Sequence, residues 1–208
     1  MTTWEVYLSG EIHSDWREAI ARGVEQANLP VKLTAPVTDH DASDHVGSMI
    51  LGEEEQAFWR DHKSAKINAI RTRTLLQRAD VVVVRFGEKY RQWNAAFDAG
   101  FASALGKPVI VLHDAEHTHA LKEDGAAAPA VADRPDGVVR EVELHVRVLL
   151  LHHVEMGLED GDRRALAPVL PRLAHHHVAG GIHLVVEPLA LGDAQHIGPD
   201  LLLTLRRA

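Results

Sequence analysis

The sequence predicts an α/β fold, a three-layer sandwich around a parallel sheet of about five strands. Two apolar runs, residues 81–84 and 109–112, consist of Val, Ile and Leu. Runs without polar alternation are typical of parallel strands covered on both faces. A helix-length segment joins the runs and closes on Gly106, with Pro108 just beyond. Strand, helix and strand make a βαβ unit, so we expect a flavodoxin-like or Rossmann-like sheet with its ligand beyond the carboxyl ends of the strands.

The chain before this unit supplies two further strands and a helix between them. Residues 4–9 are expected to form the first strand, which Gly10 ends, and residues 31–35 form the second. Residues 15–27 have the apolar spacing of a helix, and Ser14 can cap it. These strands are expected to belong to the same parallel sheet.

A polar insertion separates the second strand from the central unit and runs from residue 36 to about residue 63. Its Glu53-Glu54-Glu55 run favours the start of a short helix ending near Trp59, because acidic side chains stabilise a helix N-terminus. Residues 64–78 then predict a longer helix. The positions expected to face inward are Ile67, Ile70, Thr74 and Leu75.

After the central unit, residues 128–132 are expected as an edge strand and residues 136–146 as a closing helix. The composition then changes, since every aromatic residue lies at or before Phe101 and no Lys follows Lys122. Aromatic side chains normally dominate core energetics. We therefore expect a domain over residues 1–147 and an atypical extension over residues 148–208. A shifted reading frame with poor order is one hypothesis for the extension, and a genuine Leu- and Val-rich segment is the other.

The overall composition bounds the class of protein. A hydrophobic content of 46% and a charged content of 25% are ordinary for a globular chain of 208 residues. The net charge of -8 argues against a nucleic-acid partner, which would need a basic face. There are no cysteines, so disulfides and thiolate chemistry are excluded. No signal-peptide pattern and no membrane-length apolar run is present, and we expect a cytoplasmic protein without a membrane partner.

Asp98 is the first candidate for chemistry. It lies near the start of the helix that follows the strand at 81–84, and a carboxylate there can attack an anomeric carbon or stabilise oxocarbenium charge. The alternative is an ion pair with Arg85 or Arg91 that fixes the loop. The segment from Phe86 to Asn94 precedes the same helix and is expected to line the site.

The first strand and the loops supply further candidates. Gly10 lets the backbone approach a ligand closely, and Tyr7 can face the site or remain a buried strand residue. Glu11 and Glu88 are possible acids. The candidates for substrate contact are Ser9, Gly10, Phe86, Gly87, Trp93 and Asn94. Trp93 can stack on a base, whereas a core Trp with Asn94 as a helix cap explains the same residues.

The insertion contributes a polar set, and the helix after it contributes Arg71. His40, Asp41 and Asp44 are competent metal ligands, yet we expect them to act as a lid that binds ribose or base, with no metal. The same insertion, with Trp59 and Arg60, is alternatively a subunit interface. Arg71 can bind a carboxylate or phosphate bidentately.

Several motifs carry a resemblance to a known superfamily. Asp98-Ala99-Gly100-Phe101-Ala102, followed by Leu105-Gly106-Lys107-Pro108, resembles the Glu-x-Gly-aromatic-Ala…Gly-Lys-Pro signature of the nucleoside 2-deoxyribosyltransferase superfamily. Tyr7-Leu8-Ser9-Gly10 resembles its first-strand Tyr-Leu-Ala-Gly. From Tyr7 to about Lys122 the chain is similar to the YtoQ family within that superfamily, and the segments that carry this match are residues 10–17, 38–44 and 86–94.

The resemblance implies roles for three features. A glutamate at the position of Asp98 is the superfamily's nucleophile, and a tyrosine at the position of Tyr7 orients it. Aspartate is one methylene shorter, so its role here is either nucleophilic attack or electrostatic stabilisation. Neighbouring subunits of the superfamily often complete each other's sites, which leads us to expect a homo-oligomer.

Together these features predict an enzyme that acts on the N-glycosidic bond of a nucleoside, nucleotide or related ribosyl compound, as a hydrolase or transferase. Its catalytic residues would be Asp98, Tyr7 and either Glu11 or Glu88, with no cofactor. One alternative is a protein that binds a nucleotide or ADP-ribose-like ligand without turnover. Another is a metal-dependent hydrolase built on His40, Asp41 and Asp44.

Overall fold

A computed structural model describes residues 3–88, 93–157, 173–178 and 181–186. The chain divides into two compact units, residues 1–139 and residues 140–208. The elements in chain order are β1 (Trp4–Gly10), α1 (Trp16–Gln26), β2 (Val31–Thr34), α2 (His40–Asp44), α3 (Val46–Leu51), α4 (Ala57–Arg78), β3 (Val81–Phe86), α5 (Trp93–Ala104), β4 (Val109–His113), η1 (Ala115–His117), α6 (Lys122–Ala127), β5 (Ala130–Ala132), α7 (Pro135–Gly157), β6 (Leu173–Val178) and β7 (Gly181–Val186).

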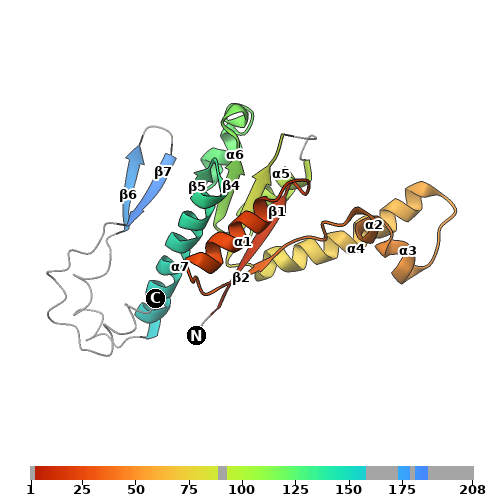
Figure 1. Cartoon of the computed structure of the whole chain (residues 1–208), viewed down its shortest axis with the longest axis horizontal. Coiled ribbons are helices and arrows are strands. Elements are labelled where there is room, and N and C mark those ends of the chain that lie inside the picture. The colour runs from red at the N-terminus through yellow and green to blue at the C-terminus, as the bar shows by residue number, and fades with distance from the viewer. Residues whose placement is uncertain (1–2, 89–92, 158–172, 179–180, 187–208) are drawn as a thin grey trace, which may run out of the picture. The chain divides into compact units, whose positions relative to one another are not determined.

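The first unit is built on a five-stranded sheet in the order β2-β1-β3-β4-β5, and every neighbouring pair is parallel. Figure 1 shows the sheet with helices on both of its faces. This arrangement confirms the predicted α/β class and the five parallel strands, and its order is that of flavodoxin-like folds. All five strands therefore end at the same edge.

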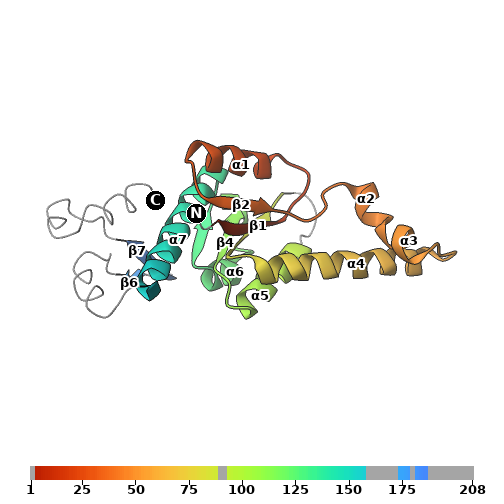
Figure 2. The same ribbon diagram turned by 90° about the horizontal axis from the view of Figure 1, so that it is seen from below.

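Strand alternation divides the core between the two faces of the sheet. On one face α5 and the last turns of α4 pack against a cluster whose buried members are Tyr7, Leu76, Ala79, Val82, Val84, Phe86, Ala95, Ala99, Ala102, Val109 and Val111. On the other face α1 buries an apolar stripe of Trp16, Ile20 and Val24. A Cβ at Gly23 would lie 2.7 Å from Val139, so the start of α7 lies beside α1. These helices and the sheet form three layers (Figure 2).

The insertion folds into an arm made of α2, α3 and the first half of α4 (Figures 1 and 2). The Ser64 hydroxyl donates to the carbonyl of Asp44 at 2.5 Å and accepts from the N–H of Gly47 at 3.0 Å. Asn68 donates to both the carbonyl and the hydroxyl of Ser43. These bonds fix α2 and α3 against α4.

Two expectations about this region are wrong. The long helix begins at Ala57 rather than at residue 64, and the Glu53-Glu54-Glu55 run precedes it outside any helix. Ile70 is 64% exposed, although the helical spacing of apolar residues predicted that it faces inward. Leu76, in contrast, is fully buried. The first turns of α4 lie beyond the sheet, where contacts with α2 and α3 replace those with the sheet.

The closing helix also differs from expectation, because α7 continues to Gly157 instead of ending near residue 146. The expected domain boundary after residue 147 therefore falls inside a helix. In the second unit, β6 and β7 pair antiparallel. The expectation of poor order falls mostly on residues 158–172, 179–180 and 187–208, which lie outside the described residues.

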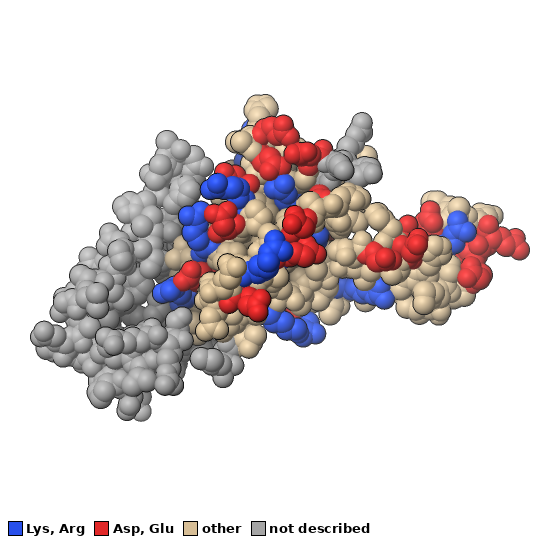
Figure 3. Space-filling model, viewed as in Figure 1, with Lys and Arg blue, Asp and Glu red and all other residues tan. Residues whose placement is uncertain are grey.

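Figure 3 shows the charge on one face of the molecule. Over the first unit, Lys and Arg alternate with Asp and Glu in this view, and several acidic side chains gather on the arm. None of the helices that the structure describes combines the length and the hydropathy needed to cross a bilayer.

Candidate active site

The candidate site forms where the carboxyl end of β1 meets α5. Tyr7 and Ser9 alternate along β1 and face this helix, and the Ser9 hydroxyl donates to Oδ2 of Asp98 at 2.5 Å. Ser9 is fully buried and Asp98 is 9% exposed. The structure therefore places the predicted carboxylate at the carboxyl edge of the sheet, in contact with a hydroxyl of the first strand.

The register of α5 explains how a short side chain reaches β1. Ala95, Asp98, Ala99 and Ala102 are buried at i, i+3, i+4 and i+7 spacing, so they share the face that packs on the sheet. Three of the four are Ala, whose small side chains let the helix approach the strands closely. At this distance an aspartate is long enough to reach Ser9.

Burial controls the charge of Asp98. Desolvation raises the pKa of its carboxyl group above the usual range, and the hydrogen bond from Ser9 offsets part of this shift. The alternative of an ion pair with Arg85 is not what the structure shows, because that guanidinium binds Asp114 at 2.9 Å. Arg91 lies outside the described residues. No described cation forms an ion pair with Asp98.

Tyr7 lies two residues before Ser9 on the same face of β1 and is fully buried. Burial and the nearby Asp98 charge together raise the pKa of its phenol to about 12. Tyr7 is therefore protonated at neutral pH. Its hydroxyl oxygen has no hydrogen-bond partner among the described residues.

Gly10 ends β1 with a φ of +104°, which L side chains rarely adopt. A Cβ at Gly10 would lie 2.1 Å from the Arg85 carbonyl oxygen, so β3 excludes any side chain there. The next N–H, that of Glu11, donates to the same carbonyl at 3.1 Å. A Cβ at Gly87 would similarly meet the Glu11 side chain at 2.3 Å. The loops after β1 and β3 are therefore in close contact.

Glu11 stabilises the loop that leads into α1. Its carboxylate accepts from the backbone N–H of His13 and, at 2.5 Å, from the hydroxyl of Ser14. Burial acts to raise the pKa of Glu11, but these hydrogen bonds and the charge of His13 outweigh it and lower the pKa. An ionised, hydrogen-bonded carboxylate is poorly suited to donate a proton.

Arg17 is a residue for which the sequence predicted no role. Its guanidinium lies over the Trp16 ring and donates to three backbone carbonyls of the first strand and loop, those of Leu8, Gly10 and Glu11. Burial lowers its pKa. It fixes the path of the backbone beside Ser9. The only available signal was a cation in the first turn of a helix that follows a strand ending in Gly.

Other predicted residues lie close to this edge of the sheet. The His40 ring stacks on His13 with centroids 5.7 Å apart, so α2 lies against the loop after β1. Asn94 is one helical turn before Asp98 on α5, and Trp93 begins that helix with 71% of its surface exposed. Glu88 is exposed in the loop after β3.

Of the remaining predicted residues, Phe86 ends β3 at this edge, and the others lie on α2 and α4. Phe86 is a buried member of the core cluster. Arg71 is exposed on α4 and donates to Asn68 at 3.4 Å. Asp41 and Asp44 are exposed on α2. In the part of the chain that the structure describes, no three His, Cys, Asp or Glu side chains converge as a metal site would require.

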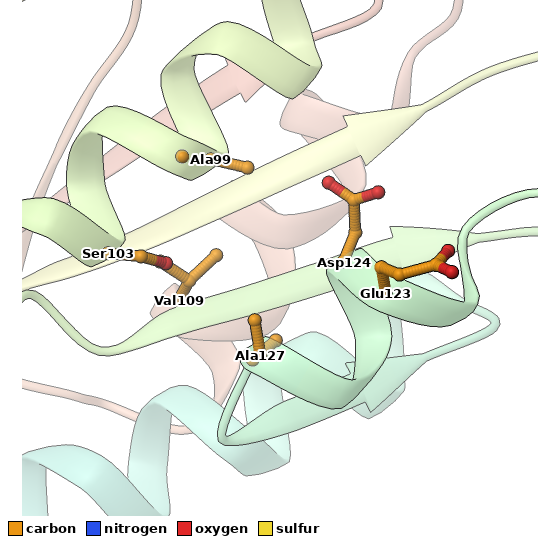
Figure 4. Close-up of a pocket in the computed structure, with 8 residues that line it drawn as sticks. Ala99, Ser103, Val109, Glu123, Asp124 and Ala127 are labelled. Atoms are coloured by element: carbon orange, nitrogen blue, oxygen red, sulfur yellow. The ribbon is translucent and has the colours of Figure 1, made fainter.

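A pocket of about 220 Å³ lies between α5, the start of β4 and α6 (Figure 4). It is lined by Ala99, Gly100, Ser103, Val109, Glu123, Asp124, Ala127 and Ala128. Neither Ser9 nor Asp98 is among these lining residues, so we treat this pocket as separate from the candidate active site.

The fold and the site together define a flavodoxin-like α/β protein with a buried carboxylate at the carboxyl edge of its sheet. Residues 7–145 match the family described as "Nucleoside 2-deoxyribosyltransferase YtoQ". The chain belongs to this family.

The relatives are consistent with this assignment. Over 118 residues the chain is 46% identical to "Uncharacterized protein YtoQ" of Bacillus subtilis, covering 57% of this chain and 80% of that protein. Two solved structures are similar at low identity. One is a 2-deoxyribosyltransferase of Bacillus psychrosaccharolyticus, at 16% identity and a TM-score of 0.39, covering 65% of this chain and 90% of that one. The other is a conserved protein of Enterococcus faecalis, at 14% identity and a TM-score of 0.48, covering 69% and 99%.

Proposed function

We propose that this protein is an enzyme that cleaves the N-glycosidic bond of a nucleoside, nucleotide or related ribosyl compound, with Asp98 as the nucleophile. One observation carries the proposal. In a chain of this family, a buried carboxylate lies at the carboxyl edge of a parallel sheet and is held by a hydroxyl rather than by a cation. An ion-paired carboxylate would be far less able to attack carbon.

The reaction needs only groups that the chain supplies. A carboxylate oxygen of Asp98 forms a bond to the anomeric carbon while the bond from that carbon to the base nitrogen breaks, and the base leaves with the bonding electrons. Water, in a hydrolase, or a second base, in a transferase, then attacks the same carbon and releases Asp98. Burial favours this chemistry because little water competes for the carboxylate.

The departing base needs a proton. The carboxyl group of Glu11 is occupied by Ser14 and His13, so we assign proton donation to Glu88, which is exposed in the neighbouring loop. Protonated Tyr7 contributes a hydrogen-bond donor near the sugar. His40, Asn94 and Trp93 lie around the same edge and contact the sugar or the base in this proposal.

The activity is tested by incubating the full chain with a panel of nucleosides and nucleoside monophosphates, with and without a second free base, and measuring released base by chromatography. Asp98→Asn is expected to lower the rate at least ~10²-fold, the scale of a lost catalytic group. Asp133→Asn, an exposed carboxylate in a surface ion pair, is the matched control and is expected to retain the rate. Equal rates for the two variants would exclude Asp98 as the nucleophile.

The same panel distinguishes the second candidate, a protein that binds its nucleotide-like ligand without turnover. The upward shift of the Asp98 pKa favours this candidate, since it increases the protonated fraction at any given pH and a protonated carboxyl does not attack carbon. Thermal stabilisation by a ligand without any released base, at a pH where Asp98 is ionised, would support binding alone.

A further inference from the structure

Ser9 and Asp98 form an isolated buried pair. The Ser9 hydroxyl donates to Oδ2 of Asp98 at 2.5 Å, and no other described residue hydrogen-bonds this carboxylate. A hydrogen bond to an ionised group is roughly twice as strong as one between neutral groups, and its loss would leave a buried charge unsatisfied. The position of the carboxylate therefore depends mainly on one hydroxyl.

Contacts with neighbouring residues hold the backbone of Ser9 in place, whereas the Asp98 side chain has fewer such contacts. Ser9 pairs with Val84 in the parallel register of β1 and β3, and Gly10, which follows it, has no room for a side chain beside Arg85. Arg17 donates to the carbonyls on both sides of Ser9, those of Leu8 and Gly10. The hydroxyl is thus held by rigid backbone, while the Asp98 side chain has only this bond to select its orientation.

Other titratable groups cannot take the same role. Tyr7 on β1 faces α5, but its hydroxyl has no hydrogen bond to Asp98. His113, at the end of β4, binds the carbonyl of Asp114 through its ring. Arg85 points to the opposite face of the sheet and pairs with Asp114. On the described elements that pack against α5 at this edge, Ser9 alone contacts the carboxylate.

We propose that Ser9 is the positioning residue for Asp98. Its hydroxyl holds Oδ2 and leaves Oδ1, which has no hydrogen bond from any described residue, to form the bond with the anomeric carbon. The role of the bond in catalysis rests on the proposed function, whereas the bond itself and its effect on Asp98 do not. Tyr7 then serves the substrate instead of orienting the nucleophile.

The experiment measures Asp98 directly in the full chain, by carboxyl ¹³C NMR with the Asp98 signal assigned by its loss in Asp98→Asn. Ser9→Ala is expected to move the titration midpoint of Asp98 upward, because burial then acts without the offsetting hydrogen bond. Ser9→Cys keeps the shape with a weaker donor and is expected to lie between wild type and Ser9→Ala. Ser48→Ala is the matched control, since Ser48 is a buried serine on α3 whose hydroxyl has no hydrogen-bond partner among the described residues.

Steady-state kinetics are measured on the same variants. Ser9→Ala is expected to lower kcat about 10- to 100-fold, the range of a charge-assisted hydrogen bond, with KM little changed. An Asp98 midpoint that does not move in Ser9→Ala, or moves equally in Ser48→Ala, would overturn the proposal. If the midpoint moves as expected but wild type releases base from no substrate, Ser9 still positions Asp98 and the proposed function is wrong.

Discussion

At the scale of residues, the charge of Asp98 opposes the stability of the fold. Desolvation raises the pKa of this carboxyl in the folded protein above its ordinary value of 3.8. Between the ordinary and the raised value, the folded chain binds more protons than the unfolded chain. The free energy of unfolding therefore falls as the pH rises through this interval.

Asp98→Asn should consequently raise the melting temperature at neutral pH while it abolishes activity. The amide keeps an oxygen that can accept from Ser9, but it has no buried charge to desolvate. The gain should shrink as the pH falls through the raised pKa and disappear below 3.8, where the carboxyl is protonated in the folded and the unfolded chain alike. Thermal unfolding of both proteins across this range is the measurement. A difference that does not depend on pH would show that Asp98 is not desolvated in the folded protein.

At the scale of elements, α5 shows how small residues position a site. Its sheet-facing side carries Ala95, Ala99 and Ala102, and its opposite side carries Gly100, where an added Cβ would meet no atom within 4 Å. The helix ends before Gly106, which has a φ of +69° and also has open space around it. The two glycines thus differ in backbone conformation and not in available room.

This difference predicts opposite effects of the same substitution. Gly100→Ala should increase the free energy of unfolding by about 0.5–1 kcal/mol, because Ala is the better residue in a helix interior. Gly106→Ala should decrease it by about 1 kcal/mol, because a Cβ is strained at positive φ. Chemical denaturation of the two variants beside wild type measures both. A destabilised Gly100→Ala would mean that the pocket beside it is occupied or closed in solution.

At the scale of the whole molecule, the arm carries an apolar surface that the rest of the first unit does not cover. We define the arm surface as Met49, Ile50, Leu51, Phe58 and Trp59, of which Met49 is 80% and Phe58 68% exposed. Exposed patches of this kind commonly mark interaction sites. Near the candidate site, α5 exposes Trp93 and Phe97 as well. The chain therefore offers two apolar surfaces that a second copy can cover.

We propose a homo-oligomer that buries the arm surface. Phe58→Glu should shift the chain toward the monomer in size-exclusion chromatography with light scattering, because a charge would enter the interface. Val131→Glu, at an exposed position on the edge strand β5, is the control and should leave the assembly unchanged. A wild-type chain that is monomeric at micromolar concentration would contradict this proposal.

The expected domain covers residues 1–147, the family match covers residues 7–145, and the first compact unit covers residues 1–139. However, α7 continues to Gly157, so the helix and the family match end at different places. Local sequence predicted a helix stop near residue 146 because the composition changes there. The sequence-based prediction did not consider that a segment rich in Leu and Val can also continue a helix.

The sequence by itself determined the parallel sheet and the position of Asp98 near the start of the helix that follows β3. Unbroken runs such as residues 81–84 and 109–112 admit few structures other than buried strands, and their order along the chain fixes the edge at which ligands bind. These features depend on residues that are close together in the sequence, so they can be predicted from the sequence alone.

Only the tertiary structure decided which groups share the site. Ser9 and Asp98 are 89 positions apart in the sequence. The Glu11 carboxylate accepts hydrogen bonds from Ser14 and His13. Arg17 donates to the carbonyl of Leu8 in the preceding strand. The same is true of Ile70, because α4 reaches the core of the sheet only in its last turns, near Leu76. Hydrogen bonds and burial depend on which elements meet in space, and residue spacing along one element carries no information about its partners.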